Sequence, residues 1–261
     1  MGALEPNRLP AGPHIVVEDL TMAFGSFVLQ NDLSFTVNRG DVFIIMGGSG
    51  CGKSTLLRHM VGLQRPASGR VLYDGTLSFW DAQPEERDRI MKRIGILYQS
   101  GALWSSMTLA ENVALPLREY TRLSQADIRE LCSLKLALVG LSGFEDYYPS
   151  EISGGMKKRA GLARAMALDP DILFLDEPSA GLDPISAKLM DDLILELRSS
   201  LGATVVVVTH ELASIFAIGN NSVFIDADAK TMIAQGDPKL LLAESDNPTV
   251  RKFLTRGGDE R

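Results

Sequence analysis

Cysteine is scarce in this sequence: Cys51 and Cys132 are the only two among 261 residues. Two cysteines cannot supply the disulfide framework of a small secreted domain, and both suit a reducing compartment such as the cytoplasm. Cys51 lies inside a glycine-rich segment, where it could be a redox switch or a small filler residue. We favour the filler.

Long apolar runs are also lacking. Runs such as residues 205–208 have the length of a strand, whereas a membrane-spanning helix needs about 20 apolar residues. Residues 1–6 show neither the basic nor the apolar part of a signal peptide. We therefore expect any work at a membrane to go through a partner.

Positive charge is in deficit: 26 Lys and Arg against 33 Asp and Glu give a net charge of −7. A sequence-independent nucleic-acid binder needs a positive field, so we expect no nucleic-acid partner. The chain has no internal repeat and no low-complexity segment. Its 45% of hydrophobic residues suit one domain with an inserted subdomain.

Glycine is concentrated in residues 47–54, which read GGSGCGKS and match the pattern GxxxxGK[ST]. An apolar strand pattern precedes this segment, and a predicted helix begins at Lys53. Backbone N–H groups of such a loop converge on phosphate oxygens, Lys53 can reach the outer phosphates, and the Ser54 hydroxyl can bind Mg²⁺. A glycine-rich turn could match by chance, but the flanking strand and helix argue against it. We expect a nucleoside triphosphate to bind through Gly47, Gly48, Ser49, Gly50, Cys51, Gly52, Lys53, Ser54 and Thr55.

The apolar patterns predict an α/β fold. Residues 172–175 and 205–208 are continuously apolar, as in a parallel sheet covered on both faces. The first strands lie close together in sequence and are expected to form an antiparallel layer. Strands are predicted at residues 15–20, 28–30, 33–37, 42–46, 70–73, 94–98, 172–175, 204–208, 223–225 and 232–234.

Helices are predicted mainly in residues 100–167. Within this stretch, Ser124 opens a helix as a capping residue, and its apolar face would carry Ile128, Leu131, Leu134 and Leu138. Asp183 followed by proline starts a later helix with the apolar stripe Ile185, Leu189, Leu193 and Leu197. A last helix spans residues 248–254. We expect a flexible N-terminal arm (1–13), a nucleotide-binding domain (14–240, with a helical subdomain at about 100–167) and a short C-terminal helical tail (241–261).

Polar side chains follow several strands. Asp176 and Glu177 end one strand; the first carboxylate could hold Mg²⁺ through water and the second could accept a proton from attacking water. A strand that ends in acids can equally be a plain turn. His210 follows the neighbouring strand, and Gln99 follows residues 94–98; either could be an ordinary surface residue.

Residues 149–161 contain a glycine pair followed by Lys157, Lys158 and Arg159. If a helix begins at the glycines, these charges have the wrong sign for its N-terminus. That conflict indicates either a site where an anion arrives or a solvated basic face. Residues 179–183, which end in Asp183, follow the acid pair as a tight turn.

Taken in order, these segments resemble the nucleotide-binding subunit of ATP-binding-cassette (ABC) transporters over residues 14–240. Residues 47–54 match the Walker A loop, Asp176 and Glu177 the end of Walker B, and residues 179–183 the D-loop. Gln99 matches the Q-loop and His210 the switch histidine. The signature motif corresponds to Ser153, Gly154, Gly155 and Met156, and the aromatic that stacks on adenine to Phe24.

The resemblance implies a P-loop NTPase (RecA-like) core with an antiparallel β layer and an inserted α-helical signature subdomain. It implies a homodimer in which two ATP molecules are sandwiched with Mg²⁺, each between one phosphate loop and the partner's signature motif. Glu177 and His210 would be catalytic, and Ser54, Gln99 and Asp176 would serve the metal. The signature usually ends in Gln; Met156 cannot donate a side-chain hydrogen bond, so a polar role there is lost.

A narrower resemblance, carried by residues 99–104, 111–119, 153–156 and 248–254, is to the Mla and related MCE-associated lipid-transport ATPases. It implies phospholipid transport between inner and outer membranes and a peripheral position on the cytoplasmic face of the inner membrane. An MlaE-like permease would dock near residues 100–120, with a small MlaB-like STAS-domain subunit and an MCE substrate-binding protein as further partners. The alternatives are a small-solute importer ATPase and a soluble ABC ATPase without a permease.

Overall fold

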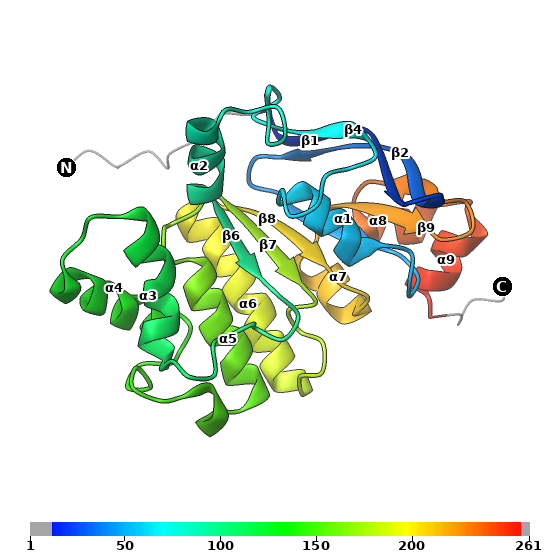
Figure 1. Cartoon of the computed structure of the whole chain (residues 1–261). Helices are drawn as coiled ribbons and strands as arrows, with labels where there is room; N and C mark the ends of the chain where they lie inside the picture. The colour runs from blue at the N-terminus through cyan, green and yellow to red at the C-terminus, as the bar shows by residue number, and fades with distance from the viewer. Residues whose placement is uncertain (1–11, 257–261) are drawn as a thin grey trace, which may run out of the picture.

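The computed structural model describes residues 12–256, which form two β-sheets and nine α-helices within that range (Figure 1). The first sheet is antiparallel, with the order β2-β1-β4-β5. Its strands are β1 (Pro13–Phe24), β2 (Phe27–Asn38), β4 (Ser68–Tyr73) and β5 (Leu77–Ser78). The second sheet has the order β10-β9-β3-β8-β7-β6. Its strands are β3 (Val42–Met46), β6 (Ile94–Leu97), β7 (Ile172–Asp176), β8 (Thr204–Val208), β9 (Asn221–Asp226) and β10 (Thr231–Gln235).

The second sheet is parallel except for its edge strand β10, and it separates two hydrophobic cores. Every residue of β3 and of β8 is buried. Within β3, Val42, Ile44 and Met46 face one core, and Phe43 and Ile45 face the other. Because both faces are covered, these strands are continuously apolar, as their sequences predict.

The helices cover the two faces of this sheet unequally (Figure 1). One core lies between the two sheets and includes α1 (Lys53–Met60) and Ile90 of α2 (Pro84–Lys92). The larger core includes buried residues of α3 (Leu109–Tyr120), α4 (Gln125–Leu138), α5 (Gly154–Ala165), α6 (Pro184–Leu201), α7 (Leu212–Ile218) and α9 (Pro248–Leu254). The remaining helix, α8 (Pro238–Glu244), contacts α7 and α9. Figure 1 shows α3 and α4 standing to one side of the sheets.

The register of the parallel strands brings the ends of β3, β7 and β8 to one edge. Ile45 pairs with Val208, and Val208 pairs with Asp176. The segments that follow these three strands therefore begin side by side, where α/β sheets commonly bind ligands.

A polar cluster at the opposite end of the sheet links it to the antiparallel layer. The buried His14 of β1 lies 2.7 Å (Nδ1 to Oγ1) from Thr204 of β8. Arg93 donates to Asp74 from Nη1 (2.6 Å) and to Asp171 from Nε (2.9 Å). Burial alone would raise the pKa of Asp171, but His14 and Arg93 beside it outweigh burial and lower the pKa.

The predicted fold class is confirmed, whereas two predicted helix faces were right only in part, with Ile128 and Leu197 buried as expected. In α6, Ile185 is 83% exposed and Leu189 is 42% exposed. Leu197 of the predicted stripe is buried, but the other buried residues are Met190, Asp191 and Ile194. In α4 the buried residues are Ile128, Cys132, Lys135 and Leu136, while Leu134 and Leu138 are exposed. Helical spacing alone allowed more than one apolar stripe in each helix, and tertiary contacts decided which residues are buried.

Several boundaries also differ from the sequence expectations. The predicted strands 28–30 and 33–37 form the single strand β2, because register shifts in its pairing with β1 absorb the irregularity between them. Helices α2, α7 and α8 were not predicted. Of the expected arm 1–13, residues 1–11 lie outside the described range, and Pro13 begins β1. The expected tail starts within α8, and residues 257–261 lie outside the described range. No helix within residues 12–256 is long and apolar enough to cross a membrane.

Candidate nucleotide-binding site

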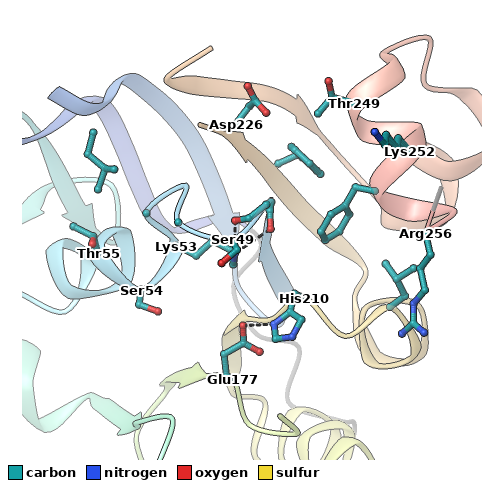
Figure 2. Close-up of a pocket in the computed structure, with 18 of the residues that line it drawn as sticks. Ser49, Lys53, Ser54, Thr55, Glu177, His210, Asp226, Thr249, Lys252 and Arg256 are labelled. Atoms are coloured by element: carbon teal, nitrogen blue, oxygen red, sulfur yellow. Dashed lines mark hydrogen bonds and ion pairs between the residues drawn. The ribbon is translucent and has the colours of Figure 1, made fainter. Parts of the chain in front are cut away.

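A cavity of about 930 Å³ lies where β3, β7 and β8 end. Figure 2 shows Glu177 and His210 turned toward one another below the loop that carries Ser49 and Lys53. The residues that line the cavity are Leu29, Gly47, Gly48, Ser49, Gly50, Gly52, Lys53, Ser54, Thr55, Gln99, Glu177, His210, Leu212, Phe224, Asp226, Thr249, Lys252, Phe253 and Arg256.

The glycine loop between β3 and α1 is held closely against β9. Gly47 has φ +150°, and a Cβ atom there would lie 2.2 Å from the carbonyl oxygen of Ile225, so only glycine fits. The buried Gln30 donates from Nε2 to the carbonyl oxygens of Cys51 and Asp226, both at 2.8 Å. The antiparallel layer therefore fixes the position of the loop.

Lys53 and Cys51 approach one another within this loop, with Nζ of Lys53 4.0 Å from Sγ of Cys51. Lys53 is buried and donates from Nζ to the carbonyl oxygens of Gly47 and Gly48, both at 2.9 Å, so its ammonium folds back over the loop. Cys51 is fully buried and does not line the cavity. Burial raises the pKa of its thiol, which disfavours the reactive thiolate and supports the filler interpretation.

Ser54 and Asp176 make a direct contact across the site. The Ser54 hydroxyl donates to Oδ1 of Asp176 at 2.9 Å. Burial raises the pKa of this carboxyl, and the charge of Glu177 beside it acts in the same direction. A cation at this point would relieve the unfavourable charge.

The oxygen atoms at this point suit Mg²⁺. Hydroxyl, carboxylate and amide oxygens are hard donors, and Gln99 lines the same cavity. Within residues 12–256 there is no group of three or more His, Cys, Asp or Glu side chains that could hold a metal ion. This does not conflict with Mg²⁺, which usually keeps several waters and binds one or two carboxylates together with substrate phosphates.

Glu177 has a strained backbone and a half-satisfied carboxylate. Its φ is +51°, a left-handed conformation that non-glycine residues rarely adopt. Its N–H donates to the carbonyl oxygen of Val208 at 2.8 Å, and Nδ1 of His210 lies 2.7 Å from its Oε1. Oε2 is buried without a partner among the described residues. Strain and an unpaired buried acceptor together are characteristic of functional positions.

The signature segment lies away from this cavity in the single chain. Ser153 caps α5, and its Oγ accepts from the N–H of Met156 at 3.3 Å. Ser153 and Gly154 are exposed, Gly155 is half-buried, and Met156 packs against the larger core. Asp183 caps α6 and is exposed, and Phe24, at the end of β1, is 51% exposed and does not line the cavity.

Two of the basic side chains near the start of α5 are hydrogen-bonded within the chain rather than available to an anion. Lys158 is buried and donates to the carbonyl oxygens of Glu177 and Ala180. Arg159 donates to the carbonyl oxygen of Val139 at 2.9 Å. The hypothesis of an anion site on this turn is therefore wrong for these two residues, whose charges are used inside the chain.

Eight cavity-lining residues were missed by sequence reasoning. Four of them come from α9 and the residues just after it: Thr249, Lys252, Phe253 and Arg256. Their spacing of three, four and seven residues is that of one helix face, which a helical pattern could have revealed. The T-shaped contact of Phe253 with Phe224 holds α9 against β9. The other missed residues are Leu29, Leu212, Phe224 and Asp226.

The comparisons with known proteins agree with this geometry. The family described as "ABC transporter" matches residues 30–180. The chain is 42% identical to the intermembrane phospholipid transport system ATP-binding protein MlaF of Escherichia coli K12, over 91% of this chain and 87% of MlaF. It is 41% identical to the probable ribonucleotide transport ATP-binding protein mkl of Mycobacterium tuberculosis H37Rv, over 94% of this chain and 67% of mkl.

A solved structure of an ATP-binding cassette with bound nucleotide is also similar to this chain. The dimeric post-hydrolysis state of the ATP-binding cassette MJ0796, bound to ADP and phosphate, matches with a TM-score of 0.77 and 28% identity, covering 85% of this chain and 98% of that one. The glycine loop, Glu177 and His210 thus line one cavity of a fold shared with this cassette. The chain belongs to the ABC transporter family and is one of its ATP-hydrolysing, ATP-binding proteins.

Proposed function

We propose that this chain is the ATPase subunit of a transporter that moves phospholipid between the inner and outer membranes through a separate permease. The observation that carries the ATPase part is the pairing of Glu177 with His210 beside the glycine loop. The lipid cargo is supported by the 42% identity to a protein named for intermembrane phospholipid transport.

In this proposal the glycine loop binds the phosphates of ATP. The N–H groups of residues 47–55 surround the phosphates, and Lys53 exchanges its carbonyl partners for the outer phosphate oxygens. Ser54 and Gln99 would hold Mg²⁺ directly and Asp176 would hold it through water. Bound there, Mg²⁺ would neutralise charge on the phosphate oxygens. Phe24 is proposed to stack on adenine.

Hydrolysis needs a water aligned with the outer phosphate. Glu177 lines the cavity with its Oε1 held by His210, and its carboxylate would accept a proton from that water. His210 would also contact the γ-phosphate. The exposed Ser153 and Gly154, with Gly155, Met156 and Asp183, would meet the nucleotide of a partner protomer, so the active form is a homodimer with two sandwiched ATP molecules.

The remaining partners belong to the membrane. We propose an MlaE-like permease, a small MlaB-like STAS-domain subunit, an MCE substrate-binding protein and a position on the cytoplasmic face of the inner membrane. Within residues 100–120, where we expect the permease to dock, Trp104 is 61% exposed and can contact it, whereas Leu117 is buried and cannot.

A second cargo has a specific observation in its favour. The mkl protein, to which this chain is 41% identical, is named for the transport of ribonucleotides, which are small solutes. The test is to purify the tagged chain from detergent-solubilised membranes, reconstitute what co-purifies with it, and measure ATP-dependent transfer of labelled phospholipid and of labelled ribonucleotide. Phospholipid transfer is expected. Ribonucleotide transfer alone would establish the importer alternative, and purification without any membrane protein would establish a soluble ATPase.

The permease contact has its own test. Trp104→Ala should lower the permease-dependent part of the ATPase rate without changing ATP affinity, because the side chain is exposed and outside the cavity. Leu240→Ala is the matched control, since Leu240 is also exposed (56%) but lies on α8, across the molecule from α3 (Figure 1). Equal losses in the two variants would contradict docking near Trp104.

A further inference from the structure

One buried charge in this chain has no role in the proposed chemistry. Lys158, in the first turns of α5, is 7% exposed. Its Nζ donates to the carbonyl oxygen of Glu177 at 2.8 Å and to that of Ala180 at 2.6 Å. Burying an ammonium is costly unless hydrogen bonds compensate it, so this placement needs a reason. Burial lowers the pKa of Lys158, while the nearby charges of Glu177 and Asp176 oppose that shift.

The two carbonyl groups bracket the turn that orients the carboxylate of Glu177. The N–H of Ala180 also donates to the Glu177 carbonyl, at 3.3 Å, so this oxygen is shared between the turn and Lys158. On the other side, the Glu177 N–H donates to Val208 of β8. The strand therefore holds one side of Glu177, and Lys158 holds the other.

This support matters because the conformation is strained. A left-handed conformation is unfavourable for an L-residue because Cβ crowds the following carbonyl oxygen, and Glu177 adopts it with φ +51°. Without Lys158 the Glu177 carbonyl would keep only the longer bond from the Ala180 N–H, and the turn would hold the carboxylate less firmly beside His210.

Lys158 also lies five residues after Ser153, on the helix that Ser153 caps. In the proposed dimer, Ser153 meets the partner's nucleotide. A displacement of α5 caused by that contact is passed directly to Glu177 of the same protomer, since Lys158 joins the helix to the turn.

We propose that Lys158 is a positioning residue that couples the signature helix α5 to the catalytic carboxylate of Glu177. The inference rests on the proposed function, in which Glu177 activates water and the signature motif acts on the partner's ATP. Lys158 itself contacts neither the cavity nor the nucleotide.

The test compares Lys158→Met with wild type in the full chain. Methionine keeps the length and the apolar stem but removes the donors. We expect kcat to fall about 10- to 100-fold, as for a misplaced catalytic group, while the Kd for a fluorescent ATP analogue stays within about threefold of wild type. Lys158→Arg keeps N–H donors and the charge, so this variant should recover part of kcat. If Lys158→Met does not fold, Lys158→Arg becomes the test. Its kcat is then expected to lie below that of wild type, with unchanged ATP affinity.

Lys135→Met is the matched control. Lys135 is also buried and pairs with Asp169 outside the catalytic cavity, so its loss should lower the melting temperature but leave kcat of the folded protein unchanged. An unchanged kcat in Lys158→Met, or a parallel loss of kcat and ATP affinity, would overturn the positioning role. A kcat of Lys158→Arg no higher than that of Lys158→Met would overturn it as well.

A double variant separates this inference from the proposal beneath it. Because Lys158 acts through Glu177, adding Lys158→Met to Glu177→Gln should cause little further loss of kcat. A further tenfold loss would contradict the coupling while leaving the role of Glu177 intact. Wild-type hydrolysis in Glu177→Gln alone would instead refute the proposed function itself.

Discussion

Nδ1 of His210 lies 2.7 Å from Oε1 of Glu177, although the two residues are 33 positions apart in sequence. They meet because β7 and β8 are parallel neighbours whose last residues pair, Asp176 with Val208. The contact orients one carboxylate oxygen and leaves Oε2 without a partner among residues 12–256. One carboxylate oxygen of Glu177 is thus oriented by His210, an arrangement compatible with the proposed role of Glu177 in hydrolysis.

Glu177→Gln should separate ATP binding from hydrolysis. Glutamine keeps the volume but cannot act as a base, so the ATPase rate should fall about 10²- to 10⁴-fold while ATP still binds. The variant should form a dimer with ATP that persists on size-exclusion chromatography. A protein that stays monomeric at saturating ATP would count against the sandwich arrangement.

Ser153→Arg tests the trans arrangement, because Ser153 lies outside the cavity of its own chain. The bulky cation should block hydrolysis without affecting ATP binding by the monomer.

Lys53→Ala removes a charge-assisted contact worth about 1.5–3 kcal/mol and should lose ATP binding. Mixing the two variants equally should restore about a quarter of wild-type activity, since half the dimers are mixed and each has one intact site. No recovery, with mixed dimers verified by differential tags, would contradict the trans site.

Gly47→Ala should destabilise the fold. Its Cβ would lie 2.2 Å from the carbonyl oxygen of Ile225, and overpacking of this kind typically costs about 1–3 kcal/mol. Urea unfolding measures the loss. Gly48→Ala is the control, because a Cβ there meets nothing within 4 Å and the unfolding midpoint should stay near wild type.

Asp171→Asn should weaken the link between the two sheets in a pH-dependent way. The pKa of Asp171 is lower in the folded chain than in the unfolded one. Its stabilising effect is therefore present above the unfolded pKa of about 3.9 and is lost as the pH falls toward the folded pKa. Because the group is partly exposed, we expect a loss of only about 1 kcal/mol at pH 7.

Urea unfolding at several pH values measures this difference. The gap between wild type and Asp171→Asn should shrink as the pH is lowered below about 4. Asp228→Asn, in an exposed turn, should show no such gap. A pH-independent difference for Asp171→Asn would indicate lost packing rather than lost charge.

The loop at residues 47–54 and its flanking elements were predictable because their signals are local. The apolar stretch before the loop and the helix after it define the chemical context of the glycines, and the capping residues Ser124 and Asp183 mark helix starts through local hydrogen bonds. Apolar stretches likewise identified most strands of the parallel sheet, since burial on both faces leaves few polar positions, such as Thr204 and Ser222.

The face of each helix could not be read in the same way. In α6, leucines at helical spacing offered one stripe, but contacts with β8 and α5 buried another, with Met190 and Ile194 in the core. In α5 the basic residues near the helix start suggested an anion-binding site as one of two interpretations. Its Lys158 is instead committed to the carbonyl groups beside Glu177, 19 residues away in sequence.

By itself, the sequence determined the fold class, the phosphate loop and the identities of the acid pair and the histidine, because short-range patterns specify strands, turns and caps. Only the tertiary structure decided that Glu177 adopts a left-handed backbone, that His210 and Lys158 hold it from two sides, and that α9 lines the same cavity. These features depend on the pairing of strands and the packing of helices distant in sequence, and hydrogen bonds over such separations leave no periodic signal in the chain.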